Sequence, residues 1–369
     1  MVSDRVGTRG TENAAAGHEP SRPASPRGDV TGWGRVIGTA LGVSLLVGFL
    51  VTIFAWPVSE TQPRDLPLAV VGPPEAVQQF SSETGAAMPG AFDVTAVPDD
   101  ESARELIRDR EVYGAVVLDP ESPPELLVAS AAGPAVARLL ENVLGQMVAQ
   151  ESAQESGGTT LAVDDVVAVP EDDPRGSVFS VAAFPMVMGG MLVGTVLSFG
   201  VAGVWRRVAG ALVAAPLAGL TATLVVQGWL GALQGSYWAN AGVIALVVAA
   251  ISTTLIGLHA ILGQPGIGIG AFVMLLLGNP LSGVTSAPEM LPAGWSDLGQ
   301  MLPAGAGATL LRSTAFFDGA AAGGPALVLA AWVAAGLVLV VLGRTLRRPA
   351  GDHAGASGES TSPGAPAAP

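Results

Sequence analysis

The sequence predicts an α-helical integral membrane protein with six transmembrane helices, one before and five after an inserted extracytoplasmic α/β domain. Two observations predict this fold class. Half of the residues are hydrophobic and 13% are charged, and the apolar residues form long uncharged blocks. Between the first two blocks, residues 57–177 carry 22 Asp or Glu against 6 Arg. So many charges cannot lie in hydrocarbon, so this region is expected to fold in water.

The first transmembrane helix is expected at 33–56, where residues 36–56 carry no charge. At about 1.5 Å per residue they cover the roughly 30 Å of a bilayer core. Trp33 and Trp56 bracket them, as aromatic residues do at membrane interfaces. A cleaved signal peptide is the competing interpretation. The length of the segment and the poor cleavage site at 55–57 favour a retained signal anchor.

Five further spans are expected in a membrane domain over 178–343. Their approximate bounds are 178–203, 208–230, 241–262, 265–282 and 325–343, with an outer loop at 283–324. Pro and Gly inside such spans are tolerated in membrane helices. The weakest is 265–282, because helix-breaking residues stand at both of its ends. A re-entrant segment is the alternative there. It would leave an odd number of spans, and the two termini would then lie on opposite sides of the membrane.

Arginine lies beside every second membrane boundary, and these residues are Arg35, Arg206, Arg207, Arg344, Arg347 and Arg348. By the positive-inside rule, both termini of this multi-pass protein then lie on the cytoplasmic side of the plasma membrane. The tails at 1–32 and 344–369 lack apolar periodicity, so we expect them to be disordered.

Strands and helices are expected to alternate in the acidic region. The predicted strands are 66–72, 92–97, 114–119, 125–130 and 161–169. One helix is predicted over 101–111, where Ser102 and Glu105 suggest a capping box. A second begins at Pro134, and its apolar stripe is Val136, Leu139, Leu140, Val143, Leu144 and Met147. This alternation predicts a small open α/β sheet.

Composition excludes several functions. All 17 basic residues are Arg, and without Lys the chain has no Walker A loop, so any ATP must act through a partner subunit. The absence of Cys excludes thiolate metal sites and Cys nucleophiles. The acidic balance argues against nucleic acid as a partner. Gly72-Pro73-Pro74 lacks the backbone donors of a dinucleotide turn. We expect no cofactor and no catalytic constellation in this chain.

Polar residues near or inside the spans are candidates for a polar path or for packing. They are Gln227, His259, Gln264 and Asn279. Interhelical hydrogen bonds are at least as good an interpretation of the amides. His259 is the one histidine in a predicted span, but no second His, Asp or Glu lies there to form a proton relay or dyad. A structural role near a helix end is favoured for it.

Two further patterns are weighed against simpler interpretations. The acidic pairs 99–100, 164–165 and 172–173 follow no calcium-loop motif, so solvated turns and a helix start explain them better than a metal site. The G-x-x-x-G patterns starting at Gly38, Gly190 and Gly266 permit close helix contact. Packing within the bundle is their expected use, with dimerisation second.

The sequence between the last two predicted spans resembles a known family. Residues 279–317 contain Ser282-Gly283, Pro288-Glu289, Leu291-Pro292, Trp295, Leu302-Pro303 and Arg312. Together with one helix, an outer α/β domain and five helices, these features resemble the membrane subunits of type-2 ABC exporters. The resemblance covers about residues 33–345 and is nearest to the subgroup related to phage-infection proteins. It adds Arg312 to the candidate residues.

The resemblance implies a permease subunit in the lipid bilayer that forms a homodimer or heterodimer and works with a separate cytoplasmic ATPase subunit. Such a complex would export a lipid, drug, peptide or polymer. The predicted inner loops, Trp205 to Arg207 and Gly263 to Gln264, are short for coupling to an ATPase. The alternative is therefore a non-transporting membrane scaffold or surface receptor, of the phage-infection or secretion-accessory type, whose outer domain binds a partner.

Overall fold

The structure, a computed structural model, describes residues 32–119, 122–154 and 161–346. Helix α1 (Trp33–Ser59) begins in one compact unit that ends at Gly48, and all later elements belong to a second unit that starts at Phe49. The two predicted tails lie almost wholly outside the described residues.

Five helices of the described chain are long and apolar enough to cross a membrane, as a multi-pass membrane protein requires. They are α1, α5 (Ser177–Gly200), α6 (Val204–Thr223) with its continuation η1 (Leu224–Trp229), α7 (Tyr237–Leu262) and α11 (Gly323–Leu346). Their positions confirm five of the predicted helices. Helix α6 starts earlier than expected, so Trp205 to Arg207 form its first turn and the predicted inner loop shrinks to residues 201–203.

The sixth predicted span is shorter than expected. Helix α8 (Gln264–Ala271) and the π-helical turn η2 (Phe272–Leu277) contain 8 and 6 residues. At about 1.5 Å per residue they reach roughly 21 Å, less than the core of a bilayer. The helix stops before Pro280, which lacks the backbone N–H needed to continue it. Whether this segment spans stays a prediction.

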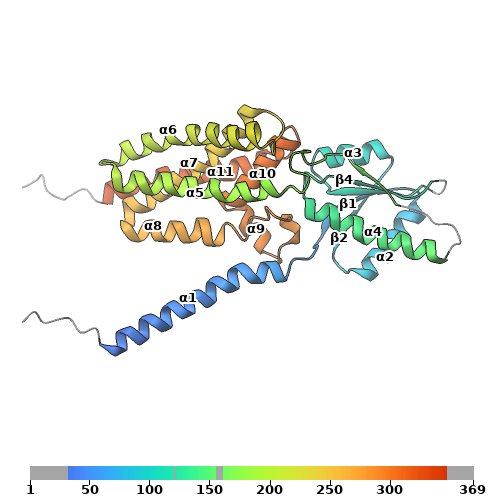
Figure 1. Ribbon diagram of the computed structural model, residues 1–369, viewed down its shortest axis with the longest axis horizontal. Helices are drawn as coiled ribbons and strands as arrows, with labels where there is room; N and C mark the ends of the chain where they lie inside the picture. Colours follow the sequence, from blue (N-terminus) through green and yellow to red (C-terminus); the bar gives the residue numbers. More distant parts are fainter. Residues whose placement is uncertain (1–31, 120–121, 155–160, 347–369) are drawn as a thin grey trace, which may run out of the picture. The chain divides into compact units, whose positions relative to one another are not determined.

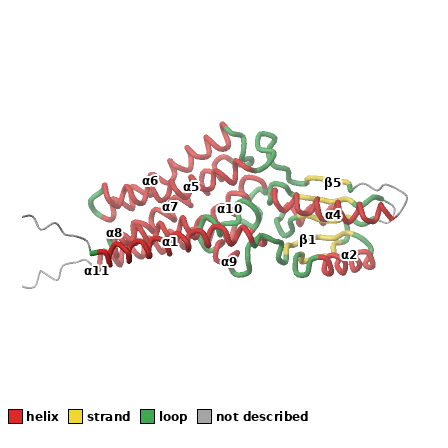
Figure 2. The backbone as a smooth tube through the Cα atoms, turned by 60° about the horizontal axis from the view of Figure 1, so that its bottom comes forward, coloured by secondary structure: helices red, strands yellow, loops and turns green. Residues whose placement is uncertain are grey.

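Helix α7 is the centre of the bundle, with α5, α6, α8 and α11 packed around it (Figures 1 and 2). Most of its side chains are buried. Glycines of the neighbouring helices let the backbones approach closely. A Cβ on Gly190 would lie 2.9 Å from Ile251 Cβ, and one on Gly336 would lie 2.6 Å from the Thr253 carbonyl carbon. The G-x-x-x-G pattern at Gly190 and Gly194 is thus used for packing within the bundle, as predicted.

In the chain, the α/β domain follows α1 and precedes α5. Its strands are β1 (Leu66–Val71), β2 (Phe92–Val97), β3 (Gly114–Val117), β4 (Glu125–Val128) and β5 (Ala162–Asp165), and its helices are α2 (Pro74–Ala87), α3 (Asp100–Arg108) and α4 (Pro134–Gln154). All five predicted strands are confirmed: β2 has its predicted bounds, and the other four end earlier than predicted. The capping box expected at Ser102 and Glu105 is wrong, because Asp99 is the N-cap and accepts a hydrogen bond from the Ser102 N–H.

The five strands form one mixed sheet in the order β2-β1-β3-β4-β5. Strand β1 pairs in parallel with β2 and with β3, β3 pairs antiparallel with β4, and β4 pairs in parallel with β5. The connection from β1 through α2 leads to β2 on one side of β1, and the connection from β2 through α3 leads to β3 on the other side. Since such crossovers are right-handed, α2 and α3 lie on opposite faces of the sheet.

Alternating residues of each strand fill two cores. Leu66, Leu68 and Val70 pack with α2 and α4 on one face. Ala69 and Val71 pack with α3 on the other. Residues from the segment between η2 and α11 complete both cores: Ala287 and Met290 join the first, and Phe317 joins the second. The domain is thus built from two distant parts of the chain.

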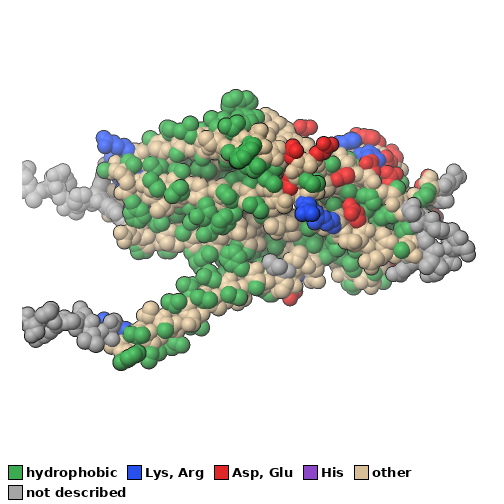
Figure 3. All heavy atoms as spheres, in the orientation of Figure 1, with side chains coloured by type: hydrophobic (Ala, Val, Ile, Leu, Met, Phe, Trp, Pro, Cys, Tyr) green, Lys and Arg blue, Asp and Glu red, His purple; other side chains and the backbone are tan. Residues whose placement is uncertain are grey.

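The segment predicted as a loop at 283–324 is largely ordered as helix. It contains the short 3-10 turn η3 (Pro288–Met290), α9 (Trp295–Gln300) and α10 (Pro303–Phe316). Helix α10 is mostly buried and packs on α7, where Gly307 contacts Val247. Hydrophobic side chains cover the helices of the bundle, and Asp and Glu side chains gather on the α/β domain (Figure 3).

Gly190→Ala tests the close packing of α5 on α7. The added methyl group has no room against Ile251, so we expect a loss of about 1–3 kcal/mol and a lower unfolding midpoint in detergent. Gly189→Ala is the matched control, because a Cβ there meets open space. Equal midpoints for the two variants would contradict this packing.

Candidate functional site

The α/β domain meets the bundle at four polar side chains near α10, which we call the joint cluster. It consists of Arg110, Tyr113, Glu289 and Arg312. The first two belong to the connection between α3 and β3, Glu289 lies in η3, and Arg312 lies in α10. Segments almost 200 residues apart in the sequence thus meet at one place.

Arg110 ties the α/β domain directly to α10. Its backbone is left-handed, with φ of 63°, a conformation that non-glycine residues seldom adopt. Its Nη1 donates to the Thr309 carbonyl oxygen at 3.1 Å and to Ser313 Oγ. The guanidinium carbon lies 5.3 Å from the centroid of the Phe317 ring. Burial lowers the pKa of Arg110 below its ordinary value.

Tyr113 and Glu289 form the second link. The Tyr113 hydroxyl donates to Glu289 Oε2 at 2.6 Å, a short bond of the kind expected when the acceptor is charged. The Arg64 N–H donates to the Glu289 carbonyl oxygen at 3.1 Å, so the start of the domain also holds η3. Burial, followed by the negative charge of Glu289, raises the pKa of Tyr113.

Arg312 is the most deeply buried charged side chain of the cluster, with 3% exposed. Its Nη2 donates to the Val284 carbonyl oxygen at 3.1 Å, and its guanidinium carbon lies 4.8 Å from the centroid of the Phe179 ring. Ser180 Oγ donates to the same carbonyl oxygen, so α5 and α10 meet there. Burial, and then the charge of Arg110, lowers the pKa of Arg312 to about 10.

Asp173 fixes the start of α5 beside this cluster. Its buried carboxylate accepts hydrogen bonds from the backbone N–H groups of Ser177 and Val178, at 2.9 and 2.8 Å. A carboxylate at a helix N-terminus satisfies donors that have no partner within the helix. Phe179 lies in this same first turn, and its N–H also donates to Asp173 at 3.3 Å, so the cap positions the ring that contacts Arg312.

A second polar network joins three helices of the bundle around Asn240, which is fully buried. The Asn240 amide nitrogen donates to Gln227 Oε1 at 2.9 Å and to the Gln234 carbonyl oxygen at 2.8 Å. Its amide oxygen accepts from Thr314 Oγ1 at 2.8 Å. These bonds link η1, α7 and α10, and the buried amide has partners on both its ends.

The predicted polar path is not assembled in one place. Gln227 serves as an interhelical hydrogen-bond partner through Asn240. His259 lies in the last turn of α7, where its ring centroid is 5.3 Å from that of Phe199. From Asn240 to His259 the chain runs along most of α7, on the order of 28 Å. Gln264 is exposed at the start of α8, and Asn279 is half-buried after η2.

The acidic pairs engage protein groups. Asp99 and Asp173 cap helices. Asp164 forms a 2.6 Å ion pair with Arg104, and Asp165 accepts a hydrogen bond from the Ser130 N–H at 3.0 Å. In the described part of the chain, no group of three or more His, Asp or Glu side chains is placed to hold a metal ion.

Comparison with protein-family models, with curated proteins and with solved structures finds no match to this chain. The joint cluster holds α10 to the α/β domain, while the Asn240 network holds the same helix to α7. Helix α10 is therefore bonded both to the α/β domain and to α7.

Three residues of this site were missed by the sequence analysis: Arg110, Tyr113 and Asn240. Arg110 and Tyr113 stand in an ordinary charged turn after a helix, and nothing in that pattern indicates burial. Asn240 directly precedes the uncharged stretch predicted at 241–262. An isolated Asn in that position is the one sequence feature that could have indicated a buried polar group there. Glu289 and Arg312 were noted through the family resemblance.

Tyr113→Phe tests the second link of the joint cluster. The variant leaves the half-buried Glu289 carboxylate without this donor, so we expect a loss of about 1–3 kcal/mol at neutral pH. Since folding raises the pKa of Tyr113, its contribution is fully present below about pH 10 and falls as the pH rises further. The unfolding midpoint of the unmodified protein should therefore fall more steeply above pH 10 than that of the variant.

Tyr237→Phe, at the other tyrosine of the chain, is the matched control. Parallel pH curves for Tyr113→Phe and the unmodified protein would refute the prediction.

Proposed function

We propose that this chain is the membrane permease subunit of an ABC-type exporter, which moves a lipid, drug, peptide or polymer outward with energy from a separate ATPase subunit. The observation that carries the proposal is the order of elements. One apolar helix precedes an α/β domain, apolar helices then surround α7, and α9 and α10 stand before the last long helix. This order supports the resemblance to type-2 ABC exporter subunits, which work as dimers.

The joint cluster supplies a way for such a subunit to work. Helix α10 packs on α7 and carries bonds to the α/β domain through Thr309 and Ser313. When α7 tilts, α10 and the domain move with it. ATP-driven motion on the inner side would thus reach a domain on the outer side without any flexible linker in between.

The proposed topology has six spans, with both termini in the cytoplasm and the α/β domain outside. Exposed tryptophans support it, because Trp229 and Trp238 stand where η1 ends and α7 begins. Trp205, also exposed, stands in the first turn of α6 with Arg206 and Arg207. Tryptophan marks the two interfaces, and the arginines mark the cytoplasmic one.

Protease protection tests this topology. In intact cells, external protease should cleave the α/β domain and leave epitope tags on both termini untouched. Membranes opened by detergent serve as the control, because there the tags become accessible. A tag that is digested from outside, or a domain that stays intact in cells and is cut after permeabilisation, would reverse the proposed orientation.

Co-purification tests the exporter proposal. Full-length protein extracted in mild detergent should retain a P-loop ATPase subunit, and the bound complex should hydrolyse ATP. An unrelated multi-pass protein extracted in the same way controls for non-specific recovery. If repeated preparations recover surface or secretion proteins and no ATPase, the exporter proposal fails.

A second candidate function is a non-transporting scaffold or surface receptor. The observation in its favour is the size of the proposed cytoplasmic connections. Residues 201–203 separate α5 from α6, and Gly263 alone separates α7 from α8. These connections offer little surface to an ATPase, whereas the α/β domain offers a large one to a partner outside the cell.

A further inference from the structure

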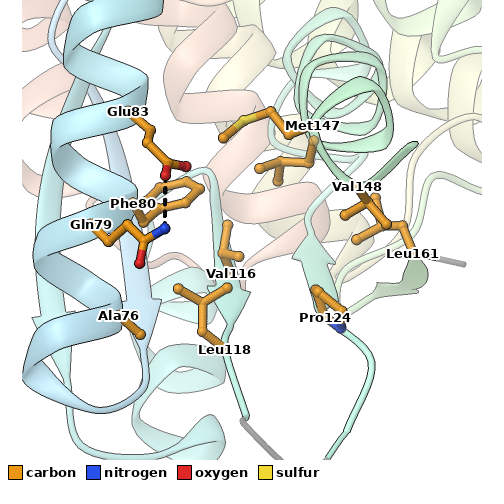
Figure 4. A pocket seen from close by; sticks show the side chains of 11 residues that line it. Ala76, Gln79, Phe80, Glu83, Val116, Leu118, Pro124, Met147, Val148 and Leu161 are labelled. Carbon is orange, nitrogen blue, oxygen red and sulfur yellow. Dashed lines mark hydrogen bonds between the residues drawn. The ribbon is translucent and has the colours of Figure 1, made fainter. Parts of the chain in front are cut away.

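The α/β domain contains an apolar cavity of about 180 Å³ between α2 and α4 (Figure 4). Its walls are mostly aliphatic or aromatic, and its lining includes Phe80, Val116, Leu118, Leu144, Met147 and Leu161. Two residues of α2, Gln79 and Glu83, form its polar side. The Gln79 amide nitrogen donates to Glu83 Oε1 at 2.8 Å, and both side chains are exposed.

The cavity lies on the face of the sheet that α2 and α4 cover, toward the carboxyl ends of β1 and β3. From β1 the chain passes through α2 to β2 on one side, and then through α3 to β3 on the other side of β1. Strands β1 and β3 stay hydrogen-bonded at their carboxyl ends, where the Leu118 N–H donates to the Val71 carbonyl oxygen at 2.8 Å, so the space opens beside the sheet, between α2 and α4. Ala76, in the first turn of α2 after β1, and Leu118, directly after β3, both line the cavity.

The size and lining of the cavity specify an apolar occupant. An apolar cavity of about 150 Å³ in a protein core stays dry and takes up a benzene-sized group. The present cavity is slightly larger and is open at one side. Met147 adds a flexible wall that adapts to an irregular or mobile chain. A few methylene groups of an alkyl chain fit this space.

Charge selects the head of that occupant. Glu83 lies at the polar side of the cavity, and the surrounding region 57–177 carries 22 acidic residues against 6 arginines. A carboxylate or phosphate head would be repelled by this field, and an ammonium head would be attracted. The Gln79 contact holds the Glu83 carboxylate on α2, facing the same side.

We propose that this cavity binds the alkyl chain of a cationic amphiphile, with Glu83 receiving the positively charged head. This site goes beyond the proposed transport function, because it requires neither an ATPase nor a transport path. It gives the α/β domain a small-molecule ligand of defined chemistry: one aliphatic chain and one ammonium group.

Photolabelling of the full-length protein in phosphatidylcholine nanodiscs tests the site. The probe is a decylammonium that carries a diazirine on its chain, and the matched anion is the decanoate with the same diazirine. We expect the ammonium probe to label peptides from α2 and α4, with the decanoate labelling them about threefold less, the effect of one exposed charge. Labelled peptides are identified by mass spectrometry.

Three variants sharpen the test. Ala76→Phe fills the cavity and should lower labelling of α2 and α4 by about tenfold, since several methylene groups lose their contacts. Ala86→Phe, at an exposed position on the same helix, should leave it unchanged. Glu83→Gln keeps an acceptor for Gln79 and should bring labelling by the two probes close to equality, a readout that survives even if Ala76→Phe fails to fold.

The outcomes divide clearly. Selective ammonium labelling that Ala76→Phe abolishes and Glu83→Gln equalises supports the proposal. Labelling confined to the membrane helices overturns it, as does equal labelling of the domain by both probes in the unmodified protein. Protection of α2 and α4 by a tightly bound protein partner, with no labelling by either probe, overturns it in favour of a protein docking site.

Discussion

Close packing around α7 is the constraint on which the rest of the structure depends. Inside a bilayer, apolar side chains gain nothing by leaving lipid for protein, so helices associate through contact between their backbones and through hydrogen bonds. Each neighbour of α7 brings a glycine to that contact: Gly194 from α5, Gly219 from α6, Gly270 from α8, Gly307 from α10 and Gly336 from α11. Because α7 is contacted closely on so many sides, its position in the bundle is fixed. Helix α7 in turn fixes the positions of the helices that pack on it.

The fixed position of α10 explains how a water-soluble fold is attached to an apolar bundle. Helix α10 is held from one side by Gly307 and the Asn240 network, and from the other by Arg110. The segments on either side of it, at Met290 and Phe317, complete the two cores of the α/β sheet. Domain and bundle therefore share a part of the chain, which makes the joint stiffer than a pair of linkers.

The sequence predicts what depends on local periodicity and fails where distant segments meet. Apolar length located five long helices, and alternation located all five strands, because both signals lie within one segment. The capping residue of α3 was missed by three positions, since Asp99 and Ser102 are both good N-caps and the choice between them is geometric. The joint cluster was out of reach for another reason. In the sequence, Arg110 looks like an ordinary solvent-exposed arginine. It is covered only because α10 docks against it, and no local sequence pattern predicts that docking.

The arginines of the joint cluster depend on compensation from a few nearby groups. Burying Arg312 costs several kcal/mol unless other groups compensate for the lost water. One carbonyl oxygen and the face of Phe179 supply part of that compensation. Glu289 adds a nearby negative charge, and it opposes the repulsion that Arg110 exerts on Arg312. Glu289, which accepts a hydrogen bond from the Tyr113 hydroxyl, thus favours the charged form of both arginines and also ties η3 to the α/β domain.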